Sequence, residues 1–88
     1  MIGLSELVSA GGIINRDIFG VSIEYKIDAP NIYIKAEYNK EFEYRMQLEL
    51  PVNSDDEIDK WDYKICYETY RIIDVLDRVY KKKYGNIN

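Results

Sequence analysis

Carboxylates are the chemically active side chains that this sequence gathers most densely. One group crowds the expected start of a helix, and a second lies on an expected strand. The residues are Asp55, Asp56, Glu57, Asp59 and Asp62, and then Glu41, Glu43 and Glu49. Carboxylate oxygens can hold hard cations such as Ca²⁺, but the sequence has no calcium-loop pattern with its required glycine. We therefore expect no metal site and no cofactor.

The sequence contains no histidine, and this absence limits its chemistry. It excludes Ser-His and Cys-His catalysis and histidine metal sites. The single cysteine, Cys66, lies in an apolar and aromatic segment, where a buried structural thiol is the expected role. Gly11-Gly12 lacks the Lys-Ser/Thr of a phosphate-binding loop and does not follow a strand. We expect a protein that is not an enzyme.

A row of tyrosines is the second unusual feature. Tyr63, Tyr67 and Tyr70 recur at helical spacing, and Ile73 lies beside them. Tyrosine combines apolar area with a hydrogen-bonding tip and is enriched in binding surfaces. Two interpretations stay open. The N-terminal helix and residues 13–14 could cover this flank, or the four residues could form an interface with a partner or a second copy.

The segment from Ser54 to Gly85 must position the row of tyrosines and the carboxylates near its own start. Its sequence predicts one long helix. Ser54 and Glu57 can form a capping box. Neither proline nor glycine interrupts the segment, and Gly85 supplies a common helix end. A stripe at the helical period is expected to face the core. It consists of Ile58, Trp61, Ile65, Thr69, Ile72, Leu76 and Val79.

Alternating apolar and polar residues predict three antiparallel strands over residues 19–27, 32–38 and 42–50. Phe19 begins the first inward-facing set. Keeping apolar residues on one face sets Ile27 opposite Ile32 in the first hairpin, and Glu24 then lies opposite Lys35. In the second hairpin, a three-residue loop over 39–41 keeps the register correct. Residues 13–14 are interpreted as no more than a short extended piece before a polar turn at 15–17.

The predicted fold is therefore α+β, in the order αβββα, as a single domain over residues 1–88. A short N-terminal helix around Leu4, Leu7 and Val8 precedes a three-stranded meander, and the long helix packs on one sheet face. That helix should be roughly 45 Å long, whereas a strand of ten residues spans about 33 Å. One end of the helix, either the acidic or the basic one, should project or meet a partner.

The net charge of −4 argues against direct binding of nucleic acid, which favours a basic surface. It suits a basic protein partner, although helix-dipole effects and solubility also explain many of the acids. The candidate acidic partner-binding residues are Glu41, Glu43, Asp55, Asp56, Glu57 and Asp59. No apolar run approaches the roughly 18 residues of a membrane span. We expect a cytoplasmic protein.

The layout of helix, meander and helix on a small acidic chain resembles small phage-encoded inhibitors of bacterial defence. It is most similar to the anti-CRISPR proteins that occupy the DNA-binding cleft of a nuclease. The resemblance spans the whole chain but rests on layout, size and charge, so it transfers no residue roles. It implies a stoichiometric inhibitor of a bacterial protein in the host cytoplasm. A homodimeric assembly subunit and a sponge for a nucleotide signal are the alternatives.

Overall fold

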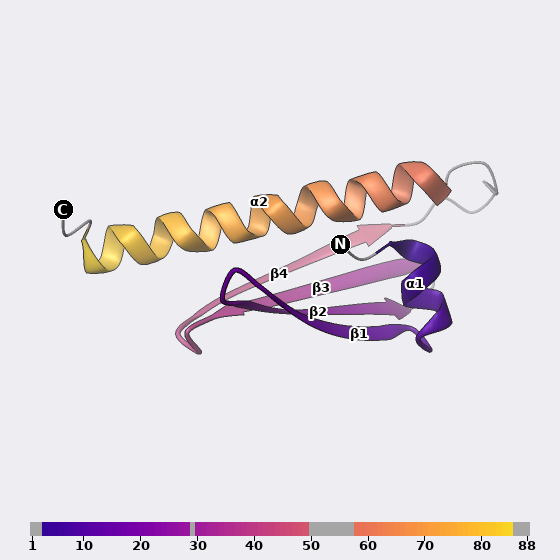
Figure 1. Cartoon of the computed structure of the whole chain (residues 1–88), viewed down its shortest axis with the longest axis horizontal. Coiled ribbons are helices and arrows are strands. Elements are labelled where there is room, and N and C mark those ends of the chain that lie inside the picture. The colour runs from indigo at the N-terminus through magenta and orange to yellow at the C-terminus, as the bar shows by residue number, and fades with distance from the viewer. Residues whose placement is uncertain (1–2, 29, 50–57, 86–88) are drawn as a thin grey trace.

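The computed structural model describes residues 3–28, 30–49 and 58–85, with the side chains of the last range from Trp61 onward. The described chain is α+β and has two layers (Figure 1). Its elements are α1 (Leu4–Ser9), β1 (Ile13–Ile18), β2 (Val21–Asp28), β3 (Asn31–Tyr38), β4 (Phe42–Glu49) and α2 (Ile58–Tyr84). The sheet is antiparallel in the order β1-β2-β3-β4. None of the described helices has the length and apolarity that a membrane crossing requires.

The sheet has four strands, so the prediction of a three-stranded meander was wrong. Residues 15–17 do not form a turn but continue β1, with Asn15 paired to Glu24 and Asp17 to Ser22. Alternation along β1 was hidden because Arg16 occupies an inward position between Ile14 and Ile18.

Arg16 is tolerated there because β1 is an edge strand and its guanidinium pairs with Glu6 of α1 at 2.6 Å. The turn that joins β1 to β2 is Phe19-Gly20, and both residues have a positive φ, 50° and 80°. Phe19 is thus not the inward strand residue that we predicted, since it lies in the turn and is 77 % exposed.

The predicted registers of the other two hairpins are confirmed. Ile27 lies opposite Ile32, and Ile34 lies opposite Met46. The second hairpin uses the expected three-residue loop, in which Asn39 and Lys40 have φ values of 56° and 58°. With these registers, the apolar side chains of the paired strands lie on one face of the sheet. A shift of one residue would instead move the apolar side chains of the shifted strand to the opposite face.

The core lies between that face and α2. Five residues of the predicted stripe are buried, and they are Trp61, Ile65, Thr69, Ile72 and Leu76. Val79 is 41 % exposed, because at this turn the neighbouring Tyr80 packs on Tyr38 and Phe42 of the sheet. The helix α2 continues past the sheet towards its C-terminal end (Figure 1). Gly85, with φ 78°, follows the helix as expected. The predicted capping box at 54–57 and the side chain of Ile58 lie outside the described residues.

The helix α1 packs beside α2 on the same face of the sheet, at the end opposite to the β1–β2 turn (Figure 1). Leu7 is fully buried, whereas Val8, another of the three apolar residues from which this helix was predicted, is 61 % exposed. A carboxylate from α2 caps α1, since Asp62 Oδ1 accepts from the Leu4 backbone N–H at 2.6 Å. The cap thus ties the start of α1 to the first described turns of α2.

Candidate interaction surface

The row of tyrosines on α2 is exposed to solvent. Tyr63, Tyr67 and Tyr70 are 73, 57 and 50 % exposed, and we call these three residues the tyrosine row. The helix α1 leaves them uncovered, and Ile13 lies on the outer sheet face, 50 % exposed. Of the two interpretations left open by the sequence, covering by the N-terminal segment is therefore wrong. Ile73 is half-buried beside the row.

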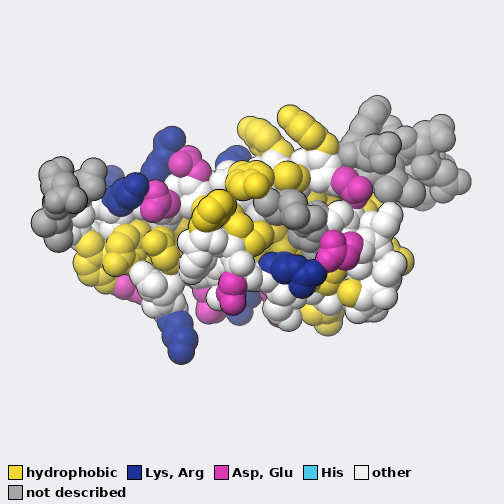
Figure 2. All heavy atoms as spheres, in the orientation of Figure 1, with side chains coloured by type: hydrophobic (Ala, Val, Ile, Leu, Met, Phe, Trp, Pro, Cys, Tyr) yellow, Lys and Arg dark blue, Asp and Glu magenta, His cyan; other side chains and the backbone are white. Residues whose placement is uncertain are grey.

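A groove continues the tyrosine row onto the sheet. It has a volume of about 340 Å³ and lies between α2 and the β1–β2 hairpin. We call it the hairpin groove, and its lining residues are Phe19, Val21, Tyr38, Tyr70, Ile73, Asp74 and Asp77. Hydrophobic side chains gather at the middle of this face of the molecule, along α2 and towards the sheet (Figure 2). Tyr70 belongs to both features, so they form one surface.

The groove exists because α1 is short. With six residues, α1 covers the sheet only at the end away from the β1–β2 turn. Beside α2, the other end of β2 has no second helix among the described residues. Sequence reasoning missed the groove, although the Phe19-Gly20 dipeptide carried a turn signal that could have placed Phe19 at the hairpin tip.

The two predicted acidic residues of the second hairpin lie on different sides of the molecule. Glu41, in the loop, accepts hydrogen bonds from Lys83 Nζ and Tyr84 Oη at the end of α2. These contacts, that of Lys83 first, lower the pKa of Glu41 below its ordinary value. The carboxylate therefore ties the hairpin tip to α2.

Glu43 lies on the outer sheet face. Its carboxylate lies 3.2 Å from Arg45 and 3.4 Å from Lys35, and the hydrogen bond from Arg45 is the main cause of its lowered pKa. The structure does not bring Glu41 and Glu43 together. Asp55, Asp56 and Glu57 lie outside the described residues, as does the side chain of Asp59.

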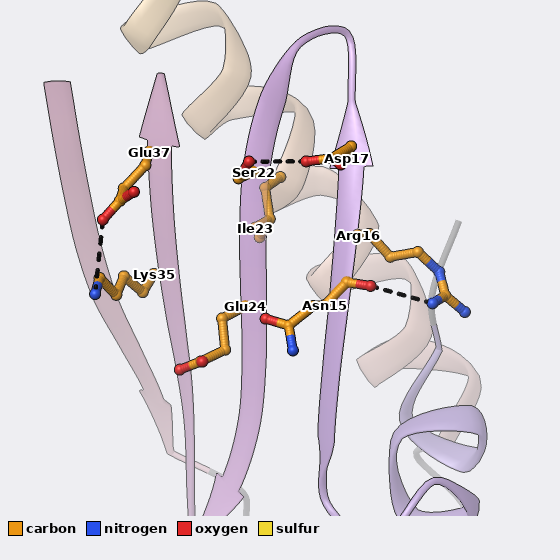
Figure 3. A pocket seen from close by; sticks show the side chains of 8 residues that line it. All are labelled: Asn15, Arg16, Asp17, Ser22, Ile23, Glu24, Lys35 and Glu37. Carbon is orange, nitrogen blue, oxygen red and sulfur yellow. Dashed lines mark hydrogen bonds and ion pairs between the residues drawn. The ribbon is translucent and has the colours of Figure 1, made fainter. Parts of the chain in front are cut away.

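The outer sheet face carries a polar hollow of about 360 Å³ (Figure 3). Its polar side chains bind one another. Ser22 donates to Asp17 at 2.8 Å, and Lys35 lies 3.7 Å from Glu37. Because acids and bases alternate along its lining, the hollow offers a partner neither a strong field of one sign nor a continuous apolar surface.

The remaining reactive groups are few. Cys66 is a free thiol that is half-buried, not fully buried as we expected. Within the part of the chain that the structure describes, no three Cys, Asp or Glu residues are grouped so that they could hold a metal ion. Every buried side-chain nitrogen or oxygen described has a hydrogen-bond partner. The exposed aromatic side chains are the feature for which the fold gives no reason.

Comparison of the chain with protein-family models, with curated proteins and with solved structures finds no match.

Proposed function

We propose that this chain is a non-enzymatic protein-binding module whose binding surface is the tyrosine row together with the hairpin groove. One observation carries the proposal: three tyrosines of a single helix face point into solvent although a neighbouring helix packs on the same sheet face. Each exposed ring leaves apolar area in water that an interface would bury.

The energetics support a protein partner. A standard interface buries about 800 Å² per partner, and its binding energy is concentrated in a few residues, often tyrosine, tryptophan or arginine. Tyrosines on a helix also lose little conformational freedom on binding, because each has only two side-chain torsions. The row is therefore a suitable centre for an interface, with Phe19 and Ile73 extending it.

We propose that the module acts by occupancy, as a stoichiometric inhibitor does, since a complementary surface suffices to block a partner. The net charge of −4 favours a basic partner surface and would speed association with it. The resemblance in layout to phage inhibitors of bacterial defence makes a nucleic-acid-binding bacterial protein, such as a nuclease, the first partner to try.

A homodimeric assembly subunit is the second candidate function. The spacing of the exposed tyrosines along α2 favours it. Tyr63, Tyr67 and Tyr70 are exposed at the 4-3 spacing of a short coiled-coil seam, and Asp74 and Asp77 continue the same helix face. In an antiparallel pair with its twofold axis near Tyr70, the tyrosines of one helix would lie against the aspartates of the other. Light scattering at high micromolar concentration decides between the candidates, because only the subunit reaches twice the 10.4 kDa of one chain.

The test of the proposed function is a quantitative pull-down from bacterial lysate with three baits. The first is the wild-type chain, and the second changes the tyrosine row to serine, which has a similar helix propensity. The third is the control Tyr33→Thr, which removes an exposed tyrosine from the outer sheet face. We expect the row variant to lose a partner that the other two retain. Equal recovery by all three baits would overturn the proposal.

A further inference from the structure

We infer that the hairpin groove receives an amphipathic helix of the partner protein that presents apolar side chains flanked by lysine or arginine. This inference rests on the proposed function and specifies which part of the partner the surface recognises. Three properties of the groove lead to it: the apolar floor, the position in the helical layer and the charge of the rim.

The floor and walls of the groove are apolar. Val21 is buried at its base, Tyr38 and Ile73 are half-buried, and Phe19 and Tyr70 stand exposed at its sides. A volume of about 340 Å³ is at the small end of the range for ligand pockets, about 300–1,000 Å³. The groove thus suits a few apolar side chains from one face of a segment.

The position of the groove favours a helical segment. The layer that covers the sheet consists of α2 with α1 beside it, and α1 covers one end only (Figure 1). A helix placed in the groove would lie against α2 and continue the layer over the β1–β2 end. Apolar residues at helical spacing, inserted into such a groove, are a common mode of peptide recognition.

The charge of the rim favours a basic segment. Asp74 and Asp77 are the charged residues among the described side chains that line the groove. Asp74 pairs with Arg78 and Asp77 with Lys81, each at 3.0 Å, one turn further along α2. All four side chains are well exposed, and such pairs are worth only about 0–1 kcal/mol. A partner's lysine or arginine can therefore share or replace them.

A second copy of this chain fits the groove less well. The sequence of α1 carries Glu6 and no cation, so it offers no positive charge to the acidic rim. The basic end of α2 is not free to enter the groove of a second copy, because it packs on its own chain. The ring centroids of Tyr80 and Tyr38 lie 5.0 Å apart. Tyr84 and Lys83 in turn bind Glu41. A separate partner is the better match.

The test uses a synthetic 14-residue amphipathic peptide, with leucine on one face and lysine on the other, titrated into the full ¹⁵N-labelled chain. We expect amide shifts to concentrate at Phe19, Val21 and Ile73. The double variant Asp74→Asn/Asp77→Asn should weaken the binding of the peptide by roughly tenfold. The control Glu24→Gln/Glu49→Gln removes the same charge from the outer sheet face and should change affinity less than twofold.

Three results would overturn the inference. They are no binding at millimolar peptide, amide shifts centred on the outer sheet face, and an equal loss of affinity in the two double variants. The last would show that the peptide responds only to net charge. A negative peptide titration would not contradict the proposed role of the tyrosine row, because the pull-down with the row variant tests that surface separately. Conversely, binding of the peptide in the groove would stand even if the row proved unnecessary for capture.

Discussion

The phenol of Tyr25 and the hydroxyl of Thr69 lie 2.6 Å apart in the core and join β2 to α2. Thr69 Oγ1 also lies 2.7 Å from the Ile65 carbonyl, to which it donates its one hydrogen. Tyr25 must therefore be the donor to Thr69. Both side chains are fully buried, so this chain of hydrogen bonds fixes how α2 sits along the sheet.

Alkaline pH should weaken the fold through Tyr25. Burial raises the pKa of this phenol above its ordinary value of 10.0. A group with a raised folded pKa contributes stability that is complete below its unfolded pKa and is lost as the pH rises towards the folded value. Unfolding free energies from urea titrations should therefore fall as the pH rises above about 10.

Tyr25→Phe isolates this effect. At pH 7 the variant should lose about 1 kcal/mol, since one buried hydrogen bond is removed. Above pH 10 its stability should fall less steeply than that of the wild type. Tyr33→Phe, on the outer face, is the matched control and should follow the wild type. Parallel pH curves for wild type and Tyr25→Phe would contradict the assignment.

The docking of α2 predicts a large effect of Leu76→Ala. Leu76 is 3 % exposed in the core, and such a truncation costs about 2–5 kcal/mol because it leaves a cavity. Val79→Ala, three residues further along α2, should cost less, since that side chain is 41 % exposed. Thermal and urea unfolding measure both. A Leu76→Ala protein that melts like the wild type would show that α2 does not pack as described.

The cap that Asp62 provides for α1 predicts coupling with Gly3. Asp62→Ala should cost about 1 kcal/mol, as the loss of a helix cap does. A Cβ at residue 3 would lie 2.8 Å from Asp62 Oδ1, so Gly3→Ala should also destabilise the protein. In the double variant this clash disappears, and the combined loss measured by urea unfolding should be smaller than the sum of the two. Strict additivity would be inconsistent with the contact.

The contacts of Glu41 predict protection of the C-terminal turn of α2. Glu41→Gln removes the charge that holds Lys83 and Tyr84, so trypsin should cleave after Lys82 and Lys83 faster than in the wild type. Glu43→Gln is the control and should leave cleavage unchanged. Because the pKa of Glu41 is lowered, the contact should persist at pH 4.5 and weaken only as the pH falls further. Hydrogen exchange of this turn can follow that loss.

Much of the fold could be predicted because side-chain alternation determines register. Ile34 lies opposite Met46 as predicted, since a loop one residue shorter or longer would have paired inward residues with charged, outward ones. The strand β1 could not be recognised in the same way, because Arg16 breaks its alternation and finds its partner, Glu6, only in the folded chain.

The candidate surface was only partly accessible to sequence reasoning. The spacing of the tyrosine row could be read directly, but its exposure depends on where α1 docks. The groove depends on the position of Phe19 at a hairpin tip and on the shortness of α1. Glu41 and Glu43 were grouped because they share a sequence neighbourhood, yet the turn directs them to different partners.

Site-specific photo-crosslinking from position 67 tests the central claim most directly. A benzophenone amino acid replaces either Tyr67 in the tyrosine row or Tyr33 on the outer sheet face, and each protein is irradiated in bacterial lysate. We predict an adduct with one other protein from position 67 that is missing from position 33. The same adducts from both positions, no adduct from position 67, or only an adduct of the chain with itself would contradict the proposed function.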